Sequence, residues 1–347
     1  MRVAVIANLK HSLPLLPGAP EDALAEYDAE ETVQAIRTAL ESAGHETLFL
    51  EADSTLLDTI RREQPDICFN IAEGITGDAR ESHVPALLEL LKIPYTGSQV
   101  LTNALSLDKA ACKGLWRDAG LPTAPFQRFR SPEAALNPRL TFPLFVKPVR
   151  EGSGMGINAR SVVHDEAELR AQVRWVIETY RQAALVETYL PGREFTVGLV
   201  GNAGLDPAPG CALVYNAQGY HIFPVLEVDA SAGASGGVYN ALAKSFALDD
   251  PEAPLYLCPA DIPDALATEL GTLAIAAFEA LEAFDVARVD FRLDAEGRPY
   301  LIEINTLPGL NPAVSDMCII SRAEGVSHAT LINEILALAL ARYGLSG

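Results

Sequence analysis

The stretch that most constrains this chain runs from Asp285 to Asn311 and contains two β-type segments joined by a turn. In the first segment, 286–293, apolar residues occupy every second position, and Arg288, Asp290 and Arg292 occupy the positions between them. Residues 294–297 (DAEG) have the composition of a turn, because glycine adopts a positive φ at little cost. With 300–305 as the return segment, we predict an antiparallel β-hairpin that has one apolar and one charged face.

The charged face of this hairpin carries a candidate metal site. Alternation in the return segment places Leu301, Glu303 and Asn305 on one side, so the hairpin would bring Glu303 and Asn305 to Asp290. All three offer oxygen, which Mg²⁺ prefers, and Mg²⁺ usually shares its shell with substrate phosphates. A solvent-facing hairpin with ordinary charges is the alternative. The metal is favoured, because a carboxylate between two isoleucines needs a partner or a metal.

Composition limits the classes of partner. A net charge of −20 among 347 residues disfavours nucleic acids and anionic membranes, so any phosphate must be held by a few lysines, glycines and metal. The five cysteines are scattered without CxxC spacing, as expected for reduced thiols of a cytoplasmic protein. No apolar run approaches ~18 residues, so we expect no membrane span. The apolar run at 3–7 reads as a strand and not as part of a signal peptide.

Residues 1 to about 95 alternate between strand and helix patterns, which predicts a parallel sheet covered by helices. The expected strands are Arg2–Ala7, Glu46–Leu50 and Asp66–Ile71, and the expected helices are Ala29–Gly44, Ser54–Arg62 and Glu81–Leu91. The dinucleotide fingerprint GxGxxG is absent after the first strand, so a dinucleotide site is not expected there.

The rest of the chain is predicted to be mixed α and β. Expected helices are Leu101–Ala119, Asp165–Tyr180, Pro263–Phe284 and His328–Tyr343. Expected strands are Phe142–Pro148, Ile157–Val163, Ala184–Tyr189, Glu194–Gly201, Gly210–Tyr215 and Ile222–Val228. A loop is expected over Ser231–Gly237, followed by irregular chain to Pro259.

Two further segments suggest nucleotide binding. In 142–158, a strand ending at Lys147 leads into three glycines around Ser153, and such loops let backbone amides approach phosphate oxygens. A flexible turn is the alternative, and the pattern is neither a Walker A nor a protein-kinase loop. In 184–196, the backbone around Glu187 to Leu190 could pair with adenine and Glu194 with ribose, although glutamates at strand ends are usually only solvated.

Four motifs, in order along the chain, resemble the ATP-grasp superfamily and specifically its D-alanine–D-alanine ligase branch. They are PALLELLKIPYTGS…ALSLDKAACKGL, FVKPVREGSGMG, VETYLPGREFTVG and RVDF…GRPYLIEINTLPG, and the resemblance extends from about Asp66 to Pro312. It implies an α/β protein of three lobes: an N-terminal lobe (1–100), a central lobe (101–190) and a C-terminal lobe (191–347), with ATP clamped between the last two. The implied activity is ATP-dependent carboxylate–amine ligation, and the resemblance also suggests a homodimer.

The resemblance assigns roles to residues that match its motifs. For ATP the residues are Lys109, Lys147 and Ser153 at the phosphates, Glu187 and Leu190 at adenine, and Glu194 at ribose. For two Mg²⁺ (or Mn²⁺) ions they are Asp290, Glu303 and Asn305. For catalysis they are Arg288, which would stabilise an oxyanion, and Lys244, on a loop that would close over the γ-phosphate.

The amino-acid half of the pattern departs from this family. The family's glycine-rich turn and Ser-x-Glu segment are missing after the first strand, and Glu26 or Asp28 could replace that glutamate, although both are typical of helix capping. After TLPG, Ser315 and Asp316 stand in place of a histidine–serine–leucine stretch, and Ser245 follows Lys244 where the family has tyrosine.

We therefore expect a ligase whose amino-acid-type substrate is not D-alanine. Glu73, at a strand end where α/β sheets bind ligands, and His83 are further substrate candidates, although a lone histidine is more often structural. D-alanine–D-alanine ligase itself, a small-molecule kinase and a non-catalytic nucleotide-binding protein remain alternatives.

Overall fold

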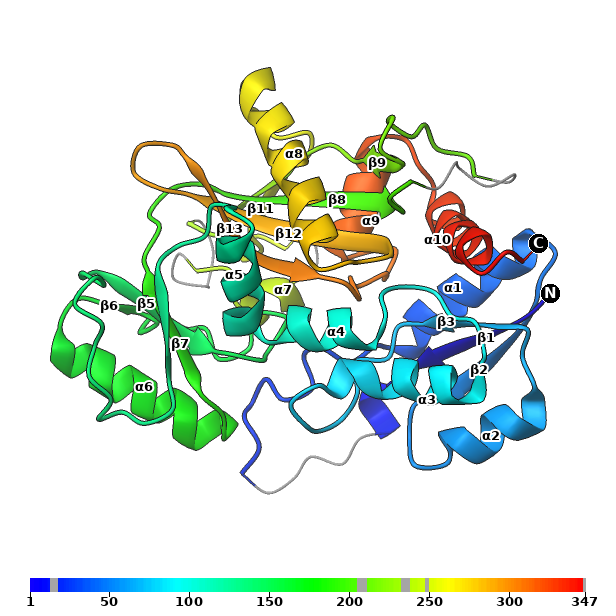
Figure 1. Ribbon diagram of the computed structural model, residues 1–347, viewed down its shortest axis with the longest axis horizontal. Helices are drawn as coiled ribbons and strands as arrows, with labels where there is room; N and C mark the ends of the chain where they lie inside the picture. Colours follow the sequence, from blue (N-terminus) through cyan, green and yellow to red (C-terminus); the bar gives the residue numbers. More distant parts are fainter. Residues whose placement is uncertain (13–17, 205–210, 232–237, 247–249, 346–347) are drawn as a thin grey trace.

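Three β-sheets organise the protein in a computed structural model that describes residues 1–12, 18–204, 211–231, 238–246 and 250–345. The side chains of residues 244 and 245 lie outside that description. Figure 1 shows the three sheets side by side, with the two chain ends close together at one edge of the molecule. No helix among the described residues is long and apolar enough to cross a membrane.

The first sheet is parallel, as the alternating pattern predicted, with strand order β2-β1-β3. Its strands are β1 (Arg2–Ala7), β2 (Glu46–Glu51) and β3 (Ile67–Asn70). The accompanying helices are α1 (Glu30–Ser42), α2 (Leu56–Glu63) and α3 (His83–Leu91), with short 3₁₀ turns η1 (Lys10–Ser12) and η2 (Arg80–Ser82). The predicted Glu81–Leu91 helix thus starts two residues later, after η2.

The single helix expected over Leu101–Ala119 is wrong, because the chain breaks at Asp108 into α4 (Val100–Leu107) and α5 (Lys109–Asp118). Asp108 has ψ 89°, and its side chain accepts a hydrogen bond from the Ala111 amide at 2.9 Å, which caps α5. The break places Lys109 at the first position of α5, where it can face the hairpin.

The second sheet is antiparallel, with strand order β4-β7-β5-β6, and α6 (Glu166–Tyr180) packs against it. Its strands are β4 (Phe126–Phe129), β5 (Leu144–Pro148), β6 (Val162–Val163) and β7 (Ala184–Thr188). The strand predicted over Ile157–Val163 shrinks to its last two residues, since 151–161 form turns. Asp165 lies just outside α6 as its N-cap.

The third sheet has the order β11-β10-β8-β12-β13, with β9 also pairing with β8. Its strands are β8 (Glu194–Gly201), β9 (Tyr220–Ile222), β10 (Leu226–Asp229), β11 (Leu255–Leu257), β12 (Asp285–Leu293) and β13 (Pro299–Asn305). The strand expected over Ile222–Val228 is instead two strands, and residues 211–215 form none. The predicted 231–237 loop lies outside the described residues after Ser231.

The predicted hairpin is present as β12 and β13, but a β-bulge changes its return strand. Asp290 pairs with Glu303, whereas Phe291 pairs with Leu301, so Ile302 is the extra residue. Leu301 therefore lies in the apolar core with Ile304, and the prediction that it shares a face with Glu303 is wrong. The bulge leaves both Ile302 and Glu303 on the side that lines cavities.

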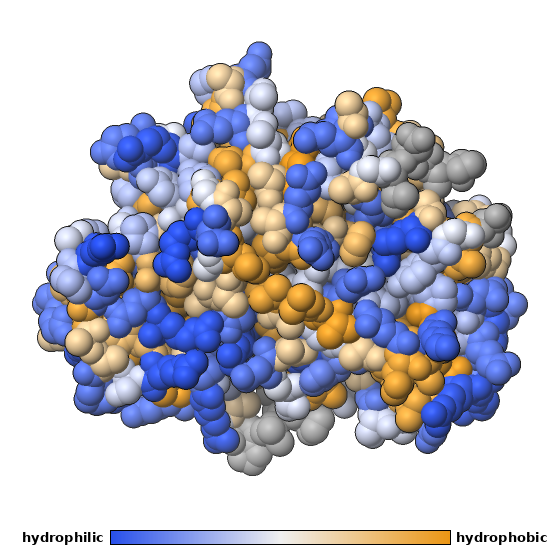
Figure 2. Space-filling model, viewed as in Figure 1, coloured by the Kyte–Doolittle hydropathy of each residue, from blue (hydrophilic) through white to orange (hydrophobic). Residues whose placement is uncertain are grey.

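Helices cover the third sheet and link it to the first. α8 (Asp264–Ala280) packs its apolar side chains on β8 and β12, and α7 (Ala241–Ser245) and α9 (Asp316–Ala323) are short helices that the sequence pattern did not predict. α10 (His328–Arg342) lies beside α1, and the two helices share one core with β1 (Figure 1). The view in Figure 2 mixes hydrophilic and hydrophobic surface, with apolar patches over the region of α3 and α4. Leu90 in α3 and Leu101 in α4 are exposed.

Candidate active site

A cavity of about 290 Å³ lies where the first sheet, the glycine loop and the hairpin meet. Segments far apart in the sequence contribute to it, among them 25–29, 152–153 and 303–309. Its charged side chains are, in chain order, Lys10, Glu26, Asp28, Glu73, Glu81, Lys109, Arg288, Glu303 and Asp316. The cavity therefore collects most of the polar residues that the sequence singled out.

The three predicted metal ligands lie together on the charged face of the hairpin. Asp290 and Glu303 are directly paired across β12 and β13, and the amide nitrogen of Asn305 donates to Oδ2 of Asp290 at 3.2 Å. Thr196 also donates to Asp290, at 2.5 Å. Within the described residues no group of three His, Cys, Asp or Glu side chains is arranged to hold a metal ion. A cation at the hairpin would have two carboxylates and one amide oxygen from the protein. That donor set fits Mg²⁺ that completes its shell with phosphate and water.

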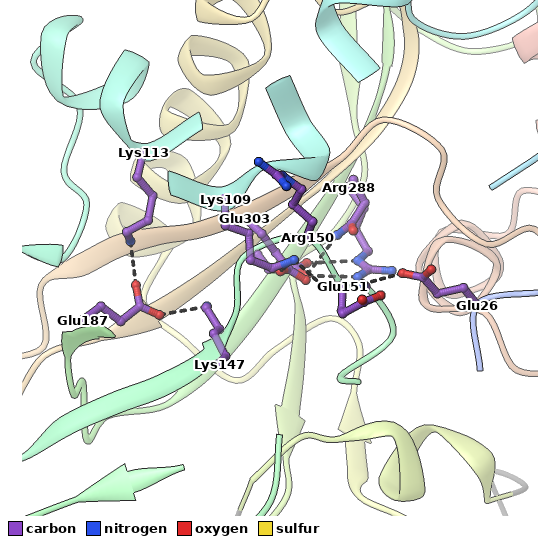
Figure 3. Close-up of polar contacts among 12 residues, drawn as sticks. Glu26, Lys109, Lys113, Lys147, Arg150, Glu151, Glu187, Arg288 and Glu303 are labelled. Carbon is purple, nitrogen blue, oxygen red and sulfur yellow. Dashed lines mark hydrogen bonds and ion pairs between the residues drawn. The ribbon is translucent and has the colours of Figure 1, made fainter. Parts of the chain in front are cut away.

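Figure 3 shows buried lysines paired with glutamates: Lys109 lies beside Glu303, and Lys113 and Lys147 lie on either side of Glu187. Lys109 Nζ lies 3.2 Å from Oε2 of Glu303, and although burial lowers its pKa, the charge of Glu303 raises it above the ordinary value. Lys147 and Lys113 flank Glu187, with Nζ–Oε distances of 2.8 and 2.9 Å. Burial raises the pKa of Glu187, but these two ammonium groups lower it more and hold it at about 2.

A smaller, mainly apolar pocket adjoins the main cavity, and Tyr239 lines both. Phe145, Ile157 and Ile302 supply apolar surface, and the end of β7 supplies backbone from Thr188 to Leu190. Glu194 lies at the same pocket, at the start of β8, and its Oε2 is 3.5 Å from Nη1 of Arg292. Apolar walls with backbone donors and acceptors at one edge suit a planar heterocycle.

The glycine loop is held by acidic residues from the N-terminal segment. Ser153 has φ 47° and lines the main cavity. The Gly152 amide donates to Glu26, and the Gly156 amide donates to Asp22 at 2.9 Å. These carboxylates therefore occupy loop amides of the kind that bind phosphate oxygens elsewhere.

The short helix α7 closes one side of this loop. A Cβ at Gly154 would lie 2.7 Å from the Asn240 backbone, so only glycine fits the contact. Lys244 lies within α7, and its side chain is outside the described part of the structure.

Of the N-terminal substrate candidates, Glu26 is already engaged. Its Oε2 accepts a hydrogen bond from Arg80 at 2.6 Å, and the Glu26 side chain is only 7% exposed. Asp28 also lines the cavity, and burial raises its pKa to about 7, against the opposing charge of Lys10. Sequence reasoning had not connected Arg80 to Glu26.

Glu73 and Glu81 line the same cavity, close enough to Glu26 for its charge to act on both. Burial, reinforced by the charge of Glu81, raises the pKa of Glu73 well above its ordinary value. Burial likewise raises the pKa of Glu81 to about 8, although Arg80 lowers it. His83 is exposed at the start of α3 and does not line the cavity, so the structure separates it from the other candidates.

Arg288 stands at the centre of a polar cluster. It donates from Nε to Asp290 at 2.9 Å, and its Nη1 lies 3.3 Å from Asp316. Tyr239 donates to the same Asp316 carboxylate at 3.1 Å. Ser315 also lines the cavity, where its Oγ accepts from the Asn311 amide at 2.9 Å.

Sequence reasoning missed Lys113, Asp22 and Tyr239. A signal existed for Lys113, because it follows Lys109 by four residues and therefore shares its face of α5. No comparable signal marked Asp22 or Tyr239, since the loop amide bound by Asp22 and the carboxylate bound by Tyr239 lie more than 70 residues away in the chain.

Comparisons with known proteins are consistent with this arrangement. Residues 115–337, more than half of the chain, match the family model for the D-ala D-ala ligase C-terminus. An uncharacterized protein of Sinorhizobium fredii, y4sG, is 39% identical over 88% of this chain and 86% of its own. D-alanine–D-alanine ligases of Pelotomaculum thermopropionicum and Bordetella petrii are 31% and 34% identical, over 90% and 87% of this chain and 92% and 84% of their own.

Solved structures agree with the fold. The crystal structure of D-alanine–D-alanine ligase from Bacillus anthracis superposes with a TM-score of 0.73 at 22% identity and covers 99% of both chains. A structure of the same enzyme complexed with ATP gives 0.72 at 21% identity. The three-sheet architecture is therefore the ATP-grasp fold that the motifs predicted.

Proposed function

The chain belongs to the D-alanine–D-alanine ligase family and is thus an ADP-forming ligase, and from that premise we propose that it joins a carboxylate to an amine through an acyl phosphate, using an amino-acid-type substrate other than D-alanine. One observation carries the proposal. Glu303 and Asn305 line the same cavity as Lys109 and Arg288, and Asp290 contacts both Asn305 and Arg288, so oxygen ligands for a cation lie beside cations for phosphate and oxyanion.

ATP fits the two adjoining pockets. The apolar pocket beside Leu190 would take adenine and Glu194 the ribose, with the phosphates directed toward Lys147, Lys109 and Ser153. Mg²⁺ held by the hairpin carboxylates would neutralise phosphate charge during transfer. In the present structure each lysine is paired with a glutamate, so phosphate binding exchanges one anionic partner for another.

The reaction follows from the weakness of a carboxylate as an electrophile. Transfer of the γ-phosphoryl group to the donor carboxylate supplies a leaving group, and the amine nitrogen then attacks the acyl carbon. Arg288, buried on the site face of β12, is placed to stabilise the tetrahedral oxyanion. Closure of α7 and the glycine loop over the cavity would exclude water, which would otherwise hydrolyse the acyl phosphate.

The donor site supports a substrate other than D-alanine. The resemblance assigns the ammonium group of the donor amino acid to a glutamate of the N-terminal segment, but Glu26, one candidate for that role, already binds Arg80 and the Gly152 amide. Asp28, Glu73 and Glu81 are the other carboxylates of this region that line the cavity. An ammonium group of the donor would then be held by Asp28, Glu73 or Glu81 and not by Glu26.

D-alanine–D-alanine ligase activity is the second candidate, favoured by relatives of that name at 31–35% identity. A coupled ADP-release screen over D- and L-amino acids, with mass spectrometry of the product, separates the two. We expect a condensation product that contains a residue other than D-alanine. Strong turnover with D-alanine alone would refute the first candidate, and tight Mg·ATP binding without ADP under any substrate pair would indicate a non-catalytic protein.

A further inference from the structure

One buried arginine, Arg288, is shared between two carboxylates that come from different elements. It contacts Asp290 of its own strand through Nε and Nη2 at 2.9 and 3.0 Å, and Asp316 through Nη1 at 3.3 Å. The side chains of Arg288 and Asp316 are 9% and 7% exposed, so water screens this pair weakly. These contacts involve at most three of the five guanidinium N–H groups, so one on each terminal nitrogen remains to donate to an oxyanion.

Asp290 is also one of the oxygen ligands assigned to a cation. It is paired with Glu303, and the Asn305 amide donates to its Oδ2, which is the oxygen that also accepts from Nη2 of Arg288. If that oxygen served a divalent cation, the guanidinium would be repelled, because both groups are positive. Cation binding would therefore weaken the contact between Asp290 and Arg288.

Asp316 makes its contacts independently of the hairpin ligands. It is the first residue of α9, and its Oδ1 accepts a hydrogen bond from the Tyr239 hydroxyl at 3.1 Å, while its Oδ2 faces Arg288. The Tyr239 hydroxyl in turn lies 3.1 Å from the Tyr256 hydroxyl. A carboxylate in the first turn of a helix often serves only the helix dipole, but that role requires neither a buried arginine nor a tyrosine donor. The contacts of Asp316 therefore suit an anchor for Arg288.

We propose that Asp316 is a positioning residue, which retains Arg288 at the reaction centre when a cation takes Asp290. The inference rests on the proposed ligase function, because that function requires the cation and the oxyanion. Without the charge of Asp316, Arg288 would stay on Asp290 and compete with the cation for its oxygens. Asp316 thus acts through Arg288 on both cation binding and stabilisation of the oxyanion.

The affinity for Mn²⁺ measures this competition without knowledge of the substrates. Binding is followed by electron paramagnetic resonance in the presence of ATP and without an amino acid. Asp316→Asn keeps an acceptor for the Tyr239 hydroxyl but removes the charge, so we expect Kd for Mn²⁺ to rise about tenfold or more. Asp264→Asn changes the exposed first residue of α8 in the same way and should leave this Kd unaltered. An unaltered Kd in Asp316→Asn overturns the inference.

Removal of the arginine separates positioning from a direct effect of the Asp316 charge on the cation. In an Arg288→Gln background the guanidinium no longer competes for Asp290, so adding Asp316→Asn should change Kd for Mn²⁺ by less than about twofold. A tenfold rise in that background means that the charge acts on the cation directly, and it overturns the inference.

A second variant gives the same separation if circular dichroism shows that Arg288→Gln does not fold. Tyr239→Phe changes no charge but removes the hydrogen bond that holds Asp316. Positioning predicts that Kd for Mn²⁺ rises about threefold in this variant, because Arg288 is held less firmly away from Asp290. An unaltered Kd in Tyr239→Phe overturns the inference, since a purely direct charge effect would be left intact.

A ligand variant distinguishes failure of this inference from failure of the proposed function. Glu303→Gln removes an anionic ligand and should weaken Mn²⁺ binding whichever residue holds Arg288. If Glu303→Gln weakens binding and Asp316→Asn does not, this inference alone is wrong. If neither variant weakens binding and no amino acid promotes ADP formation, the proposed ligase function is wrong as well.

Discussion

Lys147 and Glu187 form an ion pair of 2.8 Å between adjacent strands, and each side chain is only 4% exposed. Lys113, which is fully buried, approaches the other oxygen of Glu187 to 2.9 Å. One carboxylate therefore compensates two buried ammonium groups beneath the apolar pocket. Bound phosphate would supply the missing negative charge, which links stability to nucleotide binding.

Replacing this carboxylate should destabilise the protein strongly. Glu187→Gln leaves Lys113 and Lys147 buried without a counter-charge, and we expect the free energy of unfolding to fall by about 3–5 kcal/mol. Urea denaturation followed by circular dichroism measures the loss. The double variant Glu187→Gln/Lys113→Met should recover part of it, and a single variant as stable as the wild type would contradict this account.

Lys147 should contribute to nucleotide affinity. Lys147→Met removes a buried positive charge beside the predicted phosphate position, so Kd for ATP measured by calorimetry should rise more than about tenfold. Arg160→Met, an exposed charge change between β5 and β6, serves as the matched control. Equal Kd values for the two variants would remove Lys147 from the site.

The hairpin carboxylates should determine cation affinity. Glu303→Gln replaces an anionic ligand by a neutral one, and we expect Mn²⁺ binding in the presence of ATP, followed by electron paramagnetic resonance, to weaken by about tenfold or more. Glu296→Gln changes an exposed carboxylate on the turn of the same hairpin and should have no effect. If both variants bind Mn²⁺ like the wild type, the cation lies elsewhere.

The N-terminal segment should restrain the glycine loop. Asp22 accepts from the Gly156 amide and from the Tyr180 hydroxyl, both at 2.9 Å, so Asp22→Ala should free that amide. Hydrogen exchange at Gly156 is then expected to accelerate about tenfold or more. Glu21→Ala, an exposed neighbour, is the control, and unaltered exchange in Asp22→Ala would show that other contacts hold the loop.

Stability should fall as pH rises from about 5 to 8, because Glu81 has a folded pKa of about 8 and an unfolded value of about 4.3. In that window the folded protein keeps a proton that the unfolded chain has lost. The slope expected from one such group is roughly 1.4 kcal/mol per pH unit. Urea unfolding across this window, without ligands, should show a shallower slope for Glu81→Gln than for Glu21→Gln, and parallel profiles would contradict the assignment.

Periodicity along the sequence was sufficient to predict the elements in which apolar residues recur at regular spacing. The alternation in β12 and the apolar strands of the first sheet predicted strands that the structure contains. The prediction failed where a single residue interrupts that regular spacing. Asp108 caps α5 and divides an apparently continuous helix, and the extra residue Ile302 turns Leu301 into the core.

Residue types in the motifs were enough to predict the class of protein, because glycines, lysines and oxygen ligands at those spacings suit few other chemistries. The nucleotide half of the site, assigned from the same motifs, stays a prediction. Only the tertiary structure decided which charges meet. In the folded chain Glu26 pairs with Arg80, Lys113 with Glu187 and Asp316 with Arg288. These partners come from elements that are far apart in the sequence, such as η2 and α9. Pairing between buried charges depends on distances of a few ångströms between strands and helices, and no pattern along the chain encodes those distances.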